Sequence, residues 1–184
     1  MLFYNVDHIE AALLPLTRKA SSEFFLGSSN MCELFAHLEN GDVGSAGKAA
    51  LQAAGHFQIA SGSFLGLAQT INNQYPWVNN AVKDVSFDEA ARDASLSPDS
   101  QVVLSVVSDL LRFKLDGVLQ SCANELGGFA DRLQTTSARL GSPNVLLDVE
   151  YSEAHKLIAD WRTLMTRGQF VSSACLMSAR ISSA

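Results

Sequence analysis

Charged residues are scarce in this sequence of 184 residues, and one long stretch contains none. They make up 17% of the chain, whereas a typical soluble protein has about 25%. Residues 49–82 hold no aspartate, glutamate, lysine or arginine. A helix that lacks charge on every side is usually buried on several sides. We therefore expect this stretch to be covered by the rest of the chain, by a second subunit, or by both.

Basic residues are few and scattered. The chain has 13 Lys and Arg against 19 Asp and Glu, which gives a formal net charge of -6. Because the affinity for nucleic acids and anionic membranes depends on clustered Lys and Arg, we expect neither as a partner. Residues 49–71 are long enough to span a bilayer, but Gln52, His56 and Gln58 interrupt the apolar run. We therefore expect no membrane span, while proteins and small molecules remain as partners.

Cysteine usage is equally sparse. Cys32, Cys122 and Cys175 lie far apart, and no C-x-x-C pair occurs. An odd, widely spaced set is typical of reduced, buried thiols rather than of a disulfide framework. The opening residues MLFYNVDHIE also lack the basic and apolar regions of a secretory signal. We therefore expect a cytoplasmic protein.

Sequence motifs for common chemistries are missing as well. There is no G-x-S-x-G nucleophile motif and no G-x-x-x-x-G-K-[ST] phosphate loop. A carboxylate-bridged dimetal site in a bundle needs Glu-x-x-His pairs, and no Glu and His stand at that spacing. These absences argue against an enzyme, and the sequence gives no reason to expect a cofactor.

Helical periodicity is the strongest positive signal. Apolar residues recur at spacings of three and four along most of the chain. They predict a helix over residues 6–24, in which Pro15 produces a kink or moves the start to near Leu14. The segment GSSN, which ends at Asn30, predicts a break in the helix. Asn30 is then expected to cap a second short helix.

Three long helices are expected after this region. Asp42 or Ser45 caps the first, which contains the beginning of the uncharged stretch. Ser97 caps the longest, which continues to Gly141. The last begins after Glu150 and continues nearly to the end of the sequence. The only strand candidate, NVLLDV, is short.

Together these elements predict an all-α fold. We expect residues 1–184 to form a single domain, an antiparallel four-helix-type bundle of long helices with short extra helices. The seams expected to face the core include Ala46, Ala50, Ala53, Phe57, Ala60, Phe64 and Leu67, then Leu119, Cys122, Leu126, Phe129, Leu133 and Leu140, and finally Ala154, Leu157, Trp161 and Leu164.

Two segments are the candidate contact surfaces. The first is the uncharged helix over residues 49–71, whose small residues would let another helix approach closely. The second is an aromatic segment between helices, since Tyr and Trp recur at binding hot spots. The candidate partner-binding residues are Phe57, Phe64, Gly62 and Gly66 in the helix, and Tyr75 and Trp77 in the loop. We expect a non-enzymatic interaction or adaptor module, either a homo-oligomer or a subunit of a hetero-complex.

A bundle with a chemical centre is the first alternative. The segment GHFQIASGS resembles the short histidine-to-glycine segment of histidine phosphotransfer domains, which implies His56 as phosphoacceptor. Those domains place a lysine soon after the histidine, whereas the next lysine here is Lys83. The same histidine flanks a packed seam, so a structural role with a polar partner is the more ordinary interpretation.

Two further alternatives stay open. A metal site could be assembled from side chains of different helices, and its candidate ligands are His37, Glu33, His56 and His155. A small-molecule sensor could bind in an apolar pocket beside Gly55, Gly62 and Gly66, where missing side chains leave room.

Overall fold

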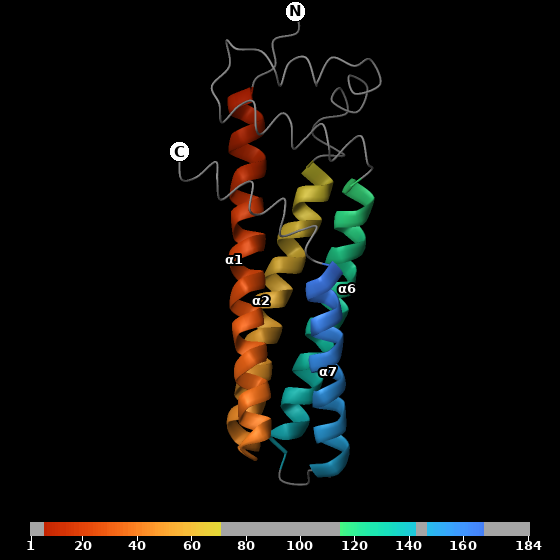
Figure 1. Ribbon diagram of the computed structural model, residues 1–184. Helices are drawn as coiled ribbons and strands as arrows, with labels where there is room; N and C mark the ends of the chain where they lie inside the picture. Colours follow the sequence, from red (N-terminus) through yellow and green to blue (C-terminus); the bar gives the residue numbers. More distant parts are fainter. Residues whose placement is uncertain (1–5, 71–114, 143–146, 168–184) are drawn as a thin grey trace, which may run out of the picture.

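The computed structural model describes residues 6–70, 115–142 and 147–167. These ranges contain four helices, α1 (Val6–Glu39), α2 (Val43–Gln69), α6 (Leu115–Leu140) and α7 (Leu147–Arg167). No strand occurs within them, so the described part of the chain is all-α. The four helices lie side by side, and α1 and α2 run in opposite directions, as do α6 and α7 (Figure 1).

The first helix differs from the sequence prediction. One continuous helix of 34 residues replaces the two that were expected, so the predicted break at GSSN is wrong. The helix also begins at Val6 and includes Pro15, which excludes a start near Leu14. Inside a helix the backbone N–H groups already have carbonyl partners, so Asn30 does not act as an N-cap. Its Nδ2 instead donates to Glu33 Oε2 at 3.1 Å.

Gly27, inside this helix, lies at a close contact with α2. A Cβ atom added at Gly27 would lie 2.7 Å from Cε1 of Phe57, and the Phe57 side chain is fully buried. The missing side chain of Gly27 therefore leaves the space in which the Phe57 ring of α2 packs against α1. A glycine inside a helix costs about 1 kcal/mol relative to alanine, and here the close approach of the ring offsets that cost.

The turn between α1 and α2 confirms the predicted capping. Gly41 adopts a positive φ of 71°, a conformation that glycine takes without strain. Asp42 is the N-cap of α2, and its Oδ1 accepts a hydrogen bond from the backbone N–H of Ser45 at 3.0 Å. A side-chain acceptor at this position satisfies one of the backbone donors that a helix leaves without a partner.

The observed ends of α6 and α7 agree in part with the sequence prediction. The last residue of α6 is Leu140, just before Gly141, as expected. The start of α7 is Leu147, earlier than the predicted start after Glu150. Asp148 and Glu150 thus lie in its first turn, where acidic side chains interact favourably with the helix dipole. The expected segments at 71–114 and 168–184 lie outside the described residues.

The core is centred on α2. This helix packs closely along both α1 and α6, whereas α7 approaches α6 and α1 less closely. Small residues make the close packing possible, because short side chains let helix axes approach one another. The buried residues of α2 are Ala46, Gly47, Ala49, Ala50, Ala53, Ala54, Phe57, Ala60, Ser63, Phe64, Leu67 and Ala68. The predicted seam of this helix is therefore confirmed over its described part.

Two serine hydroxyls join α2 to α6. Ser61 Oγ donates to the carbonyl of Ala123 at 2.6 Å, and Ser137 Oγ donates to the carbonyl of Gly47 at 2.7 Å. Each bond thus runs from one helix to the backbone of the other, near opposite ends of the contact. The predicted seam of α6 also faces inward, since Leu119, Leu126, Phe129, Leu133 and Leu140 are buried and Cys122 packs partly buried against them.

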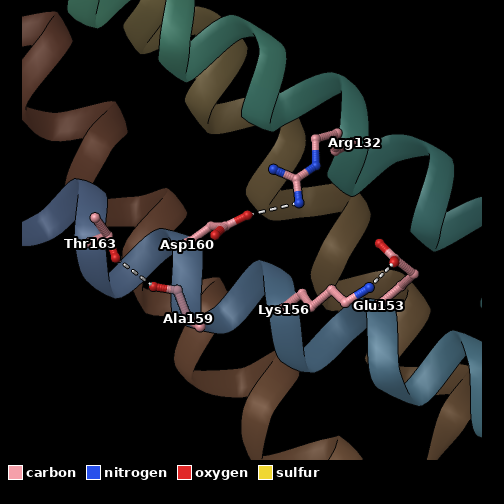
Figure 2. Close-up of polar contacts among 6 residues, drawn as sticks. All are labelled: Arg132, Glu153, Lys156, Ala159, Asp160 and Thr163. Atoms are coloured by element: carbon pink, nitrogen blue, oxygen red, sulfur yellow. Dashed lines mark hydrogen bonds and ion pairs between the residues drawn. The ribbon is translucent and has the colours of Figure 1, made fainter.

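One exposed ion pair connects α6 and α7, and a second lies within α7 (Figure 2). Arg132 Nη2 lies 2.8 Å from Asp160 Oδ2, and Lys156 Nζ lies 2.8 Å from Glu153 Oε1 within α7. Exposed pairs of this kind contribute at most about 1 kcal/mol each. The apolar contacts of α7 are therefore more important to its position, and Ala154, Leu157 and Ile158 are buried there.

Candidate functional site

The two phenylalanines predicted to bind a partner lie in the core of the chain itself. Phe57 has no exposed surface and Phe64 is 3% exposed. The ring of Phe57 lies between those of Phe24 and Phe129, with centroid distances of 5.7 and 5.5 Å. The burial of these side chains therefore needs no partner molecule.

The two glycines predicted alongside them occupy different environments. Gly62 is exposed, and a Cβ atom added there would meet no atom within 4 Å. Gly66 is half-buried, and its added Cβ would lie 3.6 Å from a methyl group of Leu16 on α1. The four helical residues named from the sequence thus do not form one surface. Tyr75 and Trp77 lie outside the described residues.

A face without charged side chains does exist on the side of α2 that points away from the core. Its residues are Leu51, Gly55, Gln58, Ile59 and Gly62, which follow one another at helical spacing, and we call it the outer face of α2. All five are exposed, with Leu51 at 52% and Ile59 at 42%. Exposed leucine and isoleucine are individually ordinary, but here they alternate with two glycines.

The outer face of α2 combines projections and open spaces. An added Cβ would meet no atom within 4 Å at Gly55 or at Gly62, so both positions are open to solvent. Lys48 is the last charged residue before this face, and no charged residue follows in the rest of α2. Sequence reasoning missed Leu51 and Ile59, although subtracting the predicted core seam from the uncharged stretch would have found them.

His56 has a polar partner within the chain. Its Nδ1 lies 2.6 Å from Glu23 Oε2 on α1, and the two side chains are 32% and 20% exposed. The contact engages one ring nitrogen and links α1 to α2, which fits the structural interpretation of this histidine. The role of His56 as phosphoacceptor stays a prediction.

The other candidate metal ligands have separate surroundings. Glu33 is bonded by Asn30, His37 Nδ1 lies 3.7 Å from Asp42 Oδ2, and His155 is exposed on α7. Across residues 6–70, 115–142 and 147–167, no three His, Cys, Asp or Glu side chains are grouped to hold a metal ion. The structure therefore does not bring these four residues together into a metal-binding group.

Two carboxylates in the described ranges have a shifted pKa, and each shift has a structural cause. Hydrogen bonds from Ser45 lower the pKa of Asp42 at the start of α2. A hydrogen bond from Lys156 lowers the pKa of Glu153 on α7. The Asp42 side chain is 51% exposed and the Glu153 side chain is 35% exposed, so these shifts mark a helix cap and an ion pair at the surface.

The glycines proposed to line a small-molecule pocket lie mainly on open surface. Gly55 and Gly62 are exposed, and no atom lies within 4 Å of an added Cβ at either position.

None of the helices in the described ranges is both long and apolar enough to cross a membrane. No protein-family model, curated protein or solved structure matches the chain. The outer face of α2 is therefore the candidate site with the most support from geometry.

Proposed function

We propose that this chain is a non-enzymatic helical interaction module that assembles with a second copy of itself through the outer face of α2. In this proposal the chain is a single-domain antiparallel four-helix bundle in the cytoplasm, where an exposed free thiol such as Cys32 stays reduced. The observation that carries the proposal is the alternation of exposed Leu51 and Ile59 with open Gly55 and Gly62 on a face without charge.

The arrangement of these residues is self-complementary. In a twofold dimer, residue i of one copy meets residue j of the other, and j meets i. If two α2 helices cross antiparallel with the twofold axis near Phe57, Ile59 of each copy faces Gly55 of the other. Leu51 then lies within one residue of the level of Gly62. Large side chains would thus fill the glycine positions, as in knobs-into-holes packing of helices.

The chain already packs helices in this way internally. A Cβ added at Gly47 would lie 3.4 Å from the side chain of Leu140, and one added at Gly127 would lie 3.2 Å from Ser61 Oγ. Glycine therefore gives α2 and α6 their close approach. Gly55 and Gly62 have the same missing side chain but no neighbour within the described part of the chain.

Charge also favours this face for contact between two copies. Each chain has a net charge of -6, so two copies repel one another over most approaches. The outer face of α2 lacks charge from Leu51 to the end of the helix. A contact at this face would not remove water from the charged side chains of α2, so it avoids the desolvation cost of a charged interface.

Sedimentation equilibrium over a range of concentrations tests the proposal. The wild-type chain should show a concentration-dependent dimer. The double variant Gly55→Gln and Gly62→Gln fills both open positions with a side chain that favours helix. It should weaken dimerisation by about tenfold or more per position, which corresponds to about 1.4 kcal/mol each.

The matched control is Gly128→Gln on α6, where an added Cβ also meets no atom within 4 Å. This variant gains the same helix propensity but lies off the outer face of α2, so it should dimerise as the wild type does. A wild-type chain that stays monomeric at every concentration would refute self-association. A double variant that dimerises normally would show that another surface makes the contact.

A further inference from the structure

A short chain of hydrogen bonds connects α7 to α1. Trp161 Nε1 donates to Ser28 Oγ at 3.2 Å, and Ser28 Oγ donates in turn to Met165 Sδ at 3.5 Å. Trp161 and Met165 are one helical turn apart on α7, so both bonds converge on one hydroxyl of α1. Ser28 is 8% exposed, and its hydroxyl therefore depends on these partners rather than on water.

The methionine in this chain of bonds is accessible. Met165 is 38% exposed, whereas Met31 on α1 has no exposed surface. A thioether sulfur is a weak acceptor with two lone pairs. The hydroxyl of Ser28 occupies one of them, and the exposure of the side chain leaves the other open to a small oxidant from solution. Oxidation of sulfur follows accessibility, so Met165 and Met31 should differ strongly in reactivity.

We infer that Met165 is a site of reversible oxidation by peroxide that loosens the attachment of α7 to α1. Hydrogen peroxide transfers one oxygen atom to the sulfur. The O–O bond breaks, an S–O bond forms, the sulfur loses two electrons, and the second oxygen leaves as water with both protons. A dithiol reductase reverses the reaction, giving the thioether, a disulfide and water.

Oxidation changes the contact because the sulfur lone pairs change. The sulfoxide places a polar oxygen on the sulfur, and the remaining lone pair becomes a poorer acceptor. The hydroxyl of Ser28 then loses its partner unless the side chain of Met165 moves. A buried donor without a partner is costly, so the sulfoxide favours withdrawal of Met165 from α1.

The position of α7 makes it sensitive to this loss. This helix approaches its neighbours less closely than α2 does. Within the described residues, the Arg162 guanidinium of α7 also contacts α1, where it lies 5.7 Å from the ring centroid of Phe35. An exposed cation–π contact contributes only about 0.5–1 kcal/mol. The bonds to Ser28 are therefore a main polar link between α7 and α1 among the described residues.

Peptide mapping after brief treatment with hydrogen peroxide tests the site. Met165 should form sulfoxide at least about tenfold faster than Met31. Hydrogen exchange in the peptides that cover residues 157–167 should then become faster, and a methionine sulfoxide reductase should restore the original rate. Equal oxidation of the two methionines, or unchanged exchange in α7 after Met165 is oxidised, would overturn the inference.

Two variants separate the contact from general damage. Met165→Leu keeps the apolar volume but cannot be oxidised, so peroxide should leave the exchange of its α7 unchanged. Ser28→Ala removes the hydroxyl, so oxidation of Met165 should accelerate exchange less than in the wild-type chain. If peroxide loosens α7 equally in Met165→Leu, the responsible group is elsewhere and the inference fails. These tests do not depend on whether the chain dimerises.

Discussion

Gly27→Ala provides the sharpest test of the packing between α1 and α2. The added Cβ would lie 2.7, 2.8 and 3.0 Å from three carbon atoms of the Phe57 ring. Ordinary van der Waals contact begins near 3.4 Å, so the ring or the helix must move by about 0.7 Å. Phe57 has no exposed surface and contacts the rings of Phe24 and Phe129, so it has little freedom to move.

Two opposing effects set the magnitude. Replacing glycine by alanine inside a helix gains up to about 1 kcal/mol. Overpacking a core typically costs about 1–3 kcal/mol, and three close contacts on a fully buried ring place this case in the upper part of that range. We therefore expect Gly27→Ala to lower the free energy of unfolding by about 1–2 kcal/mol. In contrast, Gly128→Ala meets no atom within 4 Å and should stabilise the chain by up to about 1 kcal/mol.

Urea unfolding, monitored by far-UV circular dichroism, measures the free energy of unfolding of both variants. An unchanged dependence of this free energy on urea concentration would confirm that the unfolding reaction is the same. The double variant Gly27→Ala and Phe57→Leu adds a second check. Removing the ring relieves the overlap, so the two substitutions should be less destabilising together than the sum of their separate effects. A Gly27→Ala variant at least as stable as the wild type would refute the packing of Phe57 against this glycine.

Two further substitutions test the ends of helices. Because the pKa of Asp42 is lower in the folded chain, its contribution to stability is present above the pKa of the unfolded chain and disappears as the pH falls through the folded value. Asp42→Ala should therefore be less stable than the wild type at neutral pH, and titration of the unfolding free energy into acid should remove the difference. Glu150 Oε2 is buried and has no hydrogen-bond partner in the described part of the chain. Glu150→Met should raise the free energy of unfolding by about 1 kcal/mol, because it removes this unpaired oxygen. The control Glu150→Gln should be about as stable as the wild type. A large loss of stability in Glu150→Met would reveal a partner for the oxygen.

Local sequence signals predicted the elements that depend on neighbouring residues. Asp42 marks the start of α2 because capping is decided within a few residues. The seam of Ala50, Phe57 and Phe64 predicted the buried side of α2, because helical periodicity fixes which residues share a side. The same reasoning placed α1 wrongly, since Gly27 indicates a break when its neighbours along the chain are all that is considered.

The candidate site depended on information that the sequence does not contain. The absence of charge over residues 49–82 predicted a covered helix, and α1 and α6 cover the side of α2 that holds its predicted seam. The sequence could not decide which side stays open, because that depends on where the neighbouring helices lie. As a result it named Phe57 and Phe64, which are buried, and missed Leu51 and Ile59, which are exposed.

The sequence by itself thus determined the helical character of the described part of the chain, the cap of α2, and the inward seams, all of which follow from interactions over one or two helical turns. Only the tertiary structure decided that α1 continues through Gly27, that Ser28 meets both Trp161 and Met165, and that one side of α2 has no neighbour within the described part of the chain. The contacts of Gly27 and Ser28 join residues that are 30 or more positions apart. Their contacts are fixed by the packing of whole helices, which no local pattern records.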